Sequence, residues 1–396
     1  MPHDLQLYRG CSELYGTGQH DVGKQRGILI TNDRSNMIEF IKTGNLIPGD
    51  KLANTIYNDE FKVLLRKDNR LTTSGIQAIK NLSIKGCYIE HDDGVRREYI
   101  PLSQPLLDED EKINCIRQIK ELFGNRVPFT DPFDSKFKIQ RKELEDDIKA
   151  LVRHLRDLYN TDRLLYETED YTRTVKNWIY HHTLNTCIIS IGISLYLGYA
   201  IPVIDEIAIG ALYHDYGKAF FGEELYNKPD ITYEDKEKLR KHPEIMFRIL
   251  QRLNYPVNTS YAVWQHHEKL DGEGYPKALK ADKLTMSAQI VGLASAFDNL
   301  VTMQSYNRDP MNQNDALEYL QGCNDYSIEC IRALFEFIVP YPIGARVLLS
   351  NYSTGYVLKN TKGVVMRPVV ISRGKVYDLA NDKRYLNVTI EKVLEN

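Results

Sequence analysis

The apolar residues in the middle of the chain recur with the period of a helix. Five of them lie three or four residues apart and form one face: Leu144, Ile148, Leu151, Leu155 and Leu158. Fewer than three heptads are visible, so we expect this face to pack on a core. A two-helix homodimer seam that transmits a signal stays the alternative.

A second apolar segment, Cys187 to Ile204, reaches the minimum length for a membrane span. Four residues interrupt it: Gly192, Ser194, Gly198 and Pro202. We interpret the segment as a buried helix that ends near Tyr199, followed by a turn and the next helix. We therefore expect no membrane span.

The region before these helices shows shorter patterns. It predicts a strand at 27–31, a short helix at 36–42, a turn at 58–60, strands at 61–65 and 86–90, and a helix over 74–82. Thr72 or Thr73 is positioned to cap that last helix. Residues 102–137 contain prolines and acidic runs, which predict a connector with one short helix.

Beyond Pro340 the composition changes to strand-like runs separated by turn residues. They lie at 345–349, 355–358, 364–371 and 376–379 and predict a small antiparallel β module. The whole pattern predicts a mainly α protein in three parts. These are a small α/β module and connector at 1–135, a helical domain at 136–339 and the β module at 340–396.

The composition narrows the functional classes. A length of 396 residues exceeds one ordinary core, and 42% hydrophobic with 27% charged residues is typical of a globular protein. A net charge of −3 does not favour a nucleic-acid polymer as the partner. Six scattered cysteines and a start without a signal peptide favour reduced thiols and a cytoplasmic location.

The residues that could bind a metal are concentrated in two short stretches of the sequence. His266 and His267 precede a loop that contains Gly272, Gly274, Tyr275 and Pro276. Adjacent histidines can face one metal only if the helix stops there, and the glycines supply that stop. Imidazole is a common ligand of transition metals, so the pair is a candidate metal site.

Upstream, further candidate ligands follow in order. His214 and Asp215 end an apolar helical run and come just before Gly217 and Lys218. His182 opens another apolar run, and His242 precedes Pro243. A histidine beside a carboxylate can bind one metal, or the carboxylate can bridge two.

This ordered set resembles the HD-GYP domain, a helical family of metal-dependent phosphohydrolases whose members cleave cyclic di-GMP. The resemblance covers roughly residues 140 to 335. It implies an HD-type helical bundle and two divalent transition metals, with iron or manganese expected from the histidine-rich ligands. A regulatory α/β module before the bundle also fits the family, although that similarity is weaker.

The resemblance assigns roles to individual residues. It implies one metal held by His242, His266, His267 and a bridging Asp215, and another held by His182, His214 and the same Asp215. The bridging Asp215 and Lys218 are the catalytic candidates. The candidates for binding substrate are Lys218, Asp271, Gly274, Tyr275 and Arg308, and Asp271 either orients a ligand histidine or caps its turn.

Three departures from the family pattern weaken that assignment. Ser295 stands where the family has its last aspartate ligand, which leaves Asp298, three residues on, as the remaining candidate. Trp178 stands where some members have a glutamate, so we expect no third metal. Gln304 begins a segment that is arginine-rich in the family, and Arg308 is the arginine that remains there.

Two functions follow. We expect a phosphodiesterase that hydrolyses cyclic di-GMP, or a related cyclic dinucleotide, to linear dinucleotide or GMP. The alternative is a degenerate member that binds a nucleotide or a signalling partner without turnover, the partner docking through the loop from Gly274 to Pro276. Ser295 and Gln304 favour the alternative, whereas the retained histidines and Lys218 favour the enzyme.

Overall fold

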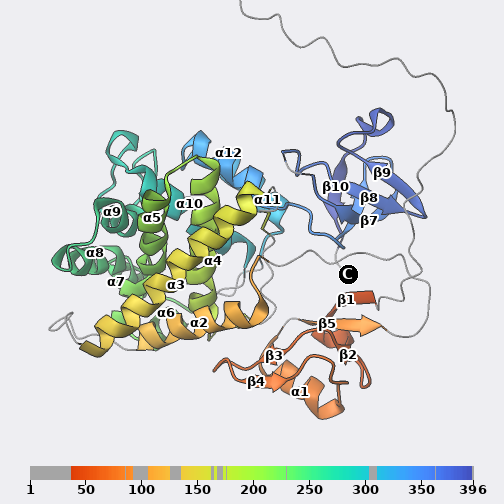
Figure 1. Cartoon of the computed structure of the whole chain (residues 1–396), viewed down its shortest axis with the longest axis horizontal. Coiled ribbons are helices and arrows are strands. Elements are labelled where there is room, and N and C mark those ends of the chain that lie inside the picture. The colour runs from red at the N-terminus through yellow and green to blue at the C-terminus, as the bar shows by residue number, and fades with distance from the viewer. Residues whose placement is uncertain are drawn as a thin grey trace, which may run out of the picture. The chain divides into compact units, whose positions relative to one another are not determined.

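The computed structural model describes residues 37–84, 86–91, 106–124, 135–161, 165–166, 173–174, 176–228, 230–302, 310–361 and 363–394. Over these residues the protein is mainly α-helical, with strands before and after the helices (Figure 1). The predicted strand at 27–31 lies outside the described residues.

The first described elements form small antiparallel sheets. β1 (Met37–Lys42), β5 (Gly86–His91) and β2 (Lys51–Leu52) form one sheet in that order, and β3 (Ile56–Tyr57) pairs with β4 (Val63–Leu65). The helix predicted at 36–42 is wrong, because this segment pairs along its length with β5 as β1. The predicted helix is confirmed as α1 (Thr73–Asn81), and the Thr72 hydroxyl accepts from the Gly75 amide to cap it.

The connector holds more helix than predicted. α2 (Glu109–Gly124) runs for 16 residues, and its apolar side is buried in the main core. A cluster of acidic residues in its first turn suits the positive end of the helix dipole. A short helical turn, η1 (Thr43–Asn45), follows β1 earlier in the chain.

We attribute the length of α2 to tertiary packing, because its apolar residues are buried in the main core.

α3 (Ser135–Asn160) carries the periodic apolar face, and the structure confirms that this face packs on the core. Leu144, Ile148, Leu151 and Leu155 are all buried in the same cluster as α2 and α4. The arrangement matches an amphipathic helix that covers the side of a bundle. The homodimer stays a prediction.

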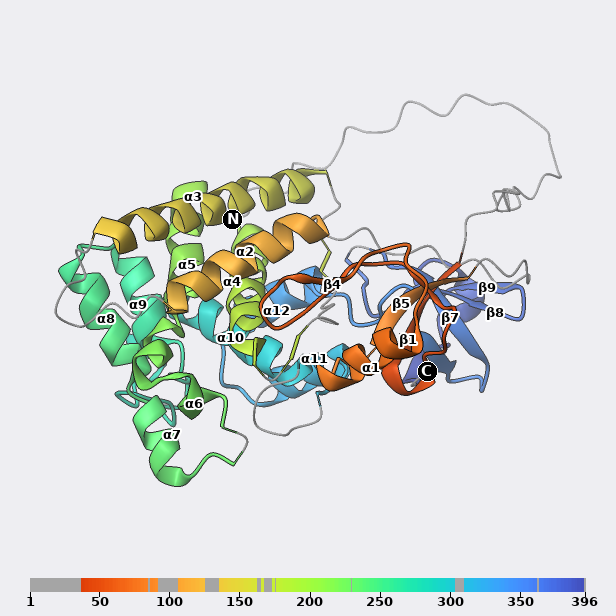
Figure 2. The ribbon, with the colours of Figure 1, turned by 90° about the horizontal axis from the view of Figure 1, so that it is seen from below.

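α4 (Trp178–Tyr196) is the central helix, and it is followed by α5 (Ile201–Tyr213) after a short turn. Every described residue of α4 up to Leu195 is buried, as expected of a helix that is apolar on all sides. α4 packs against α5, α10 and α12, so the apolar segment is a protein core, as predicted (Figures 1 and 2). No described helix is both long enough and apolar enough to cross a membrane.

The remaining helices wrap around α4 and α5. They are η2 (Tyr216–Phe221), α6 (Glu223–Tyr226), α7 (Tyr233–Leu239), α8 (His242–Arg252), α9 (Val257–Gln265), η3 (Ala281–Lys283), α10 (Met286–Val301), α11 (Gln313–Gly322) and α12 (Ile328–Phe337). α9 packs against α5, α8 and α10, which brings the ends of several helices close together. These ends carry the candidate chemistry.

The predicted C-terminal β module is confirmed. Five strands form one antiparallel sheet in the order β10-β6-β7-β8-β9. They are β6 (Arg346–Leu349), β7 (Thr354–Lys359), β8 (Val369–Ser372), β9 (Lys375–Asp378) and β10 (Ile390–Val393), with η4 (Lys383–Tyr385) before the last. β8 is shorter than the run at 364–371, and β10 was not predicted.

Candidate metal centre

Most of the candidate ligands lie at helix ends. His214 immediately follows α5, His242 is the first residue of α8, and His266 and His267 follow α9. His182 is different, because it lies inside α4. A Cβ on Gly217 would overlap the carbonyl oxygen of His242, so glycine at this position lets the turn after Asp215 lie against the start of α8.

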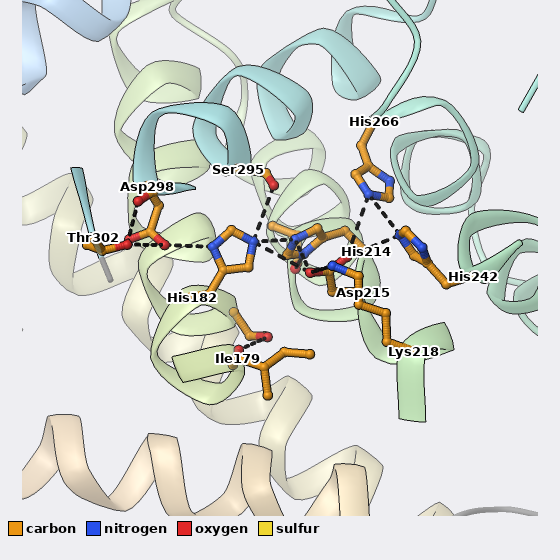
Figure 3. A network of polar contacts seen from close by, with 12 residues as sticks. Ile179, His182, His214, Asp215, Lys218, His242, His266, Ser295, Asp298 and Thr302 are labelled. Carbon is orange, nitrogen blue, oxygen red and sulfur yellow. Dashed lines mark hydrogen bonds and ion pairs between the residues drawn. The ribbon is translucent and has the colours of Figure 1, made fainter. Parts of the chain in front are cut away.

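These residues form two groups that share one carboxylate. Asp215, His242, His266 and His267 make one group, and His182, His214 and Asp215 make the other, with the ligand atoms of each group within 4.8 Å of one another. Asp215 Oδ1 lies 3.1 Å from His242 Nε2, while Oδ2 lies 3.6 Å from Nε2 of both His182 and His214. Figure 3 shows this carboxylate among the converging imidazoles.

The orientation of three imidazoles is set by the backbone. Nδ1 of His214, His242 and His266 lies 2.7, 2.6 and 2.8 Å from the carbonyl oxygen three residues earlier. A carbonyl oxygen can only accept, so Nδ1 carries the proton and donates it. In the neutral ring Nε2 then carries a lone pair, and in all three residues Nε2 is the atom that faces Asp215.

Burial keeps these rings neutral. It lowers the pKa of His214 to about 3 and the pKa of His242 below its ordinary value. Burial, reinforced by the neighbouring imidazoles, holds the pKa of His266 and His267 well below that value. At neutral pH the rings are therefore ready to donate lone pairs rather than protons.

We use the word cavity for the space enclosed by the ligand atoms of these two groups, and the atoms that line it are acceptors. Nε2 of His182 lies 3.1 Å from Nε2 of His214, and Nε2 of His242 lies 3.3 Å from Nε2 of His266. The buried Nε2 of His267 and Oδ1 of Asp215 have no hydrogen-bond donor among the described residues. Lone pairs that face one another at this distance repel, and a cation between them removes the repulsion. The residues present therefore fit divalent metal ions with nitrogen-rich coordination.

Lys218 provides a positive charge at the shared carboxylate. Its Nζ lies 2.6 Å from Asp215 Oδ2 and 5.6 Å from the centre of the Trp178 ring. Burial raises the pKa of Asp215, but Lys218 and the adjacent imidazoles outweigh that effect and hold the pKa well below its usual range. Asp215 is thus an anion, as a bridging ligand has to be.

The glycine–tyrosine–proline loop is built onto the histidine pair. The Tyr275 ring stacks on His267 with centroids 4.4 Å apart, and the Tyr275 amide donates to the His267 carbonyl oxygen. A Cβ on Gly274 would lie 2.4 Å from Glu268 Cα, so the close approach requires glycine. Asp271 accepts from the Glu273 amide at 2.8 Å and thus caps the turn.

Glu268 is a residue that the sequence analysis missed. It is buried, and its two carboxylate oxygens accept from the backbone amides of Lys277 and Leu279 at 2.7 and 2.8 Å. These bonds tie the far end of the loop back to the histidine pair. An acidic residue immediately after two histidines was the available signal in the sequence.

The α10 residues occupy different sides of His182. Ser295 Oγ lies 3.2 Å from His182 Nε2, on the side of the cavity, whereas Asp298 Oδ2 lies 2.6 Å from His182 Nδ1, on the opposite side (Figure 3). Neither group of candidate ligands includes Asp298, which the sequence placed among them. Arg308 and Gln304 lie outside the described residues.

His182 and its neighbour His181 have different surroundings. His182 contributes to the second group, whereas His181 is not in either group and lies against the Phe61 ring, with centroids 5.8 Å apart. Trp178 is buried one turn before His182 and donates from its indole nitrogen to Asn227. Trp178 therefore brings no carboxylate to the place of a third metal.

Comparisons with known proteins bear on the family to which this site is similar. Residues 194–327 match the family model described as HD domain. A cyclic di-GMP phosphodiesterase from Pseudomonas aeruginosa is 26% identical over 245 residues, which cover 61% of this chain and 56% of the relative. A cyclic di-GMP phosphodiesterase from Thermotoga maritima is 33% identical over 145 residues, covering 35% of this chain and 39% of the relative.

The chain thus spans about half the length of the curated relatives that it matches. Among solved structures, an HDG"Y"P protein from Bdellovibrio bacteriovorus covers 75% of this chain and 98% of its own, at 18% identity and a TM-score of 0.44. The family-model match, residues 194–327, includes His214, His242, His266 and His267. It confirms the resemblance inferred from the motif. Residues 194–327 thus match the HD domain family, and the relatives to which the chain is similar include cyclic di-GMP phosphodiesterases.

Proposed function

We propose that this protein is a metal-dependent phosphodiesterase that hydrolyses cyclic di-GMP or a related cyclic dinucleotide. The observation that carries the proposal is the position of Asp215, an anion shared by two groups of neutral imidazoles whose Nε2 atoms face it. The names of the relatives support this reaction class and this class of substrate.

In this proposal His242, His266, His267 and Asp215 hold one metal, and His182, His214 and Asp215 hold the other. Iron or manganese suits these ligands better than magnesium does, because imidazole nitrogen dominates both sets. The metals, when bound, would bind phosphodiester oxygens and lower the pKa of a water between them.

The protein's own groups have separate tasks. Asp215 would be a ligand of both metals, because each of its oxygens faces a different group. The Lys218 ammonium lies next to that carboxylate, where it can also offset negative charge on a bound phosphate. Tyr275, held by its stack on His267, offers a ring on which a base can stack.

Ser295 favours a second candidate function, namely binding without turnover. Its hydroxyl faces the cavity beside His182 Nε2, where a carboxylate would complete the anionic ligands. A neutral hydroxyl binds a divalent ion less well than a carboxylate does. In this alternative the weaker centre stays empty, and the site binds a cyclic dinucleotide or supports a contact with a partner.

Chromatography of the reaction products separates the two functions. The full chain, loaded anaerobically with iron or with manganese, is incubated with cyclic di-GMP or 3′3′-cGAMP, and the linear dinucleotide and mononucleotides are resolved. The Asp215→Asn variant is the matched control, since it keeps the shape of the site. Product from the native chain alone supports the enzyme. Binding in equilibrium dialysis without product supports the alternative, and neither binding nor product contradicts both.

A further inference from the structure

Asp298 lies at the centre of a buried polar network behind His182. It is 0% exposed, and both of its carboxylate oxygens accept hydrogen bonds. Oδ2 accepts from His182 Nδ1 at 2.6 Å and from Arg173 Nη1 at 3.1 Å. The Thr302 hydroxyl, which donates to the Asp298 carbonyl oxygen, lies 3.3 Å from Oδ2. Oδ1 accepts from Asn185 Nδ2 at 2.8 Å.

The other histidines show that this network supplies a hydrogen-bond acceptor for His182 Nδ1. His214, His242 and His266 each follow the end of a helix, where the last carbonyl oxygens lack intrahelical partners, and Nδ1 of each ring donates to such a carbonyl. His182 lies inside α4, where the carbonyl oxygens already accept from the helix backbone.

The carbonyl oxygen three residues before His182 already accepts hydrogen bonds from other groups. Ile179 O lies in the α4 ladder and also accepts from the Thr183 hydroxyl at 2.8 Å (Figure 3). The backbone thus offers His182 no acceptor of the kind that orients the other three rings. A side-chain acceptor has to replace it, and Asp298 stands in that position.

We propose that Asp298 is a positioning residue that acts through His182. By accepting from Nδ1, its carboxylate holds the proton on that nitrogen and aims the Nε2 lone pair at the cavity shared with His214 and Asp215. The proposal rests on the proposed function only in that the cavity binds metal.

The same contacts argue against a direct bond between Asp298 and a metal. The carboxylate lies on the Nδ1 side of the His182 ring, whereas the cavity is on the Nε2 side. Among the described residues, His182, Arg173 and Asn185 already donate to its oxygens, and the side chain of Arg173 is itself 1% exposed. To reach the cavity, the carboxylate would have to leave a buried cation behind, which is strongly unfavourable.

The first test reads the proton position directly. In metal-free full-length protein with ¹⁵N-labelled histidine, long-range ¹H–¹⁵N correlation reports which ring nitrogen of His182 is protonated, and a His182→Gln variant assigns the signal. We expect Nδ1–H in the native chain. In Asp298→Asn, and in Asp298→Ala combined with Arg173→Met so that the buried carboxylate and guanidinium are removed together, we expect a shift toward Nε2–H.

The second test measures metal affinity. Titration with Co²⁺ should show binding at the His182 group weakened about 10- to 100-fold in Asp298→Asn, with the His242 group changed less than threefold. Asp235→Asn is the matched control, because Asp235 is another buried carboxylate, one that caps α7 and pairs with Lys228. It should leave both affinities unchanged.

The outcomes are distinct. Nδ1–H retained in both Asp298 variants, or Nε2–H in the native chain, overturns the proposal. Equal weakening of both groups also overturns it, because that indicates a general loss of structure. Neither readout requires hydrolysis, so a chain that binds metal but does not cleave cyclic dinucleotides would refute the proposed enzyme and leave the role of Asp298 intact.

Discussion

The ammonium of Lys218 lies 2.6 Å from Oδ2 of Asp215, the carboxylate that both histidine groups share. Lys218 is 13% exposed at its side chain, and Trp178 covers part of it. A partly buried charge of this kind interacts more strongly than a surface ion pair would. It also places a cation next to any phosphate that enters the site.

We expect Lys218→Met to lower the hydrolysis rate by at least tenfold, or to weaken nucleotide binding, while the fold is retained. The loss follows from the missing charge at the phosphate. Lys228→Met is the control, because Lys228 also lies 2.6 Å from an aspartate but belongs to the α7 cap. Initial rates and equilibrium dialysis measure the effect. Rates and affinity equal to those of the native chain would make Lys218 a structural residue.

His242→Ala and His267→Ala should each reduce the metal bound per chain, because each removes a ligand atom from the same group. The control is His154→Ala, whose ring lies outside both groups against the Leu106 carbonyl. Elemental analysis of the purified variants gives the metal content. If both variants retain the native metal content, these histidines do not bind metal.

Ser295→Asp should raise the metal content from about one ion toward two and increase the hydrolysis rate. Ser295 faces His182 Nε2 at 3.2 Å, so a carboxylate at this position would add the anionic ligand that the second group lacks. Ser295→Asn is the control of similar size without the charge. Elemental analysis and initial rates measure the effect. Two ions in the native chain would show that the serine leaves no deficit.

Stability of the metal-free protein should fall as the pH drops from 7 to 5.5. Burial depresses the pKa of His214 to about 3, and it lowers the pKa of His242 and His266 as well. Below pH 6.5 these residues take up protons more readily in the unfolded chain than in the folded chain. Each therefore lowers the free energy of unfolding, by at most about 1.4 kcal/mol per pH unit.

Urea unfolding of chelator-treated protein at both pH values measures this dependence. A His242→Gln variant should show a weaker pH dependence, because one of these buried histidines no longer titrates in the unfolded state. A midpoint that is constant between pH 7 and 5.5 in the native chain would show that the histidines are not buried in the neutral form.

Local signals in the sequence were enough for the helical core. The apolar period of α3 and the long apolar segment of α4 and α5 report on burial directly, since a face that must leave water has to be apolar at helical spacing. The ordered histidines were also visible, as was Gly274, because a turn that approaches the backbone so closely excludes any side chain. Those signals depend only on neighbouring residues.

Segments without a distinctive local pattern were predicted wrongly or incompletely. The residues of β1 were expected to form a helix, and their strand depends on pairing with β5, which lies far along the chain. β10 was missed for the same reason, since it is defined by its pairing with β6. α2 was predicted too short, because its stability comes from burial of one face in the main core.

The tertiary structure alone decided which residues act together at the site. Asp298 follows His182 by 116 positions and Arg173 by 125, and no spacing rule relates them. The sequence offered Asp298 as a candidate ligand because it lies near the position of the missing aspartate on α10. The fold turns its carboxylate toward Nδ1 of His182 and leaves Ser295 facing the cavity. Helix phase and packing set that direction, and both depend on contacts between helices that the chain brings together only when folded.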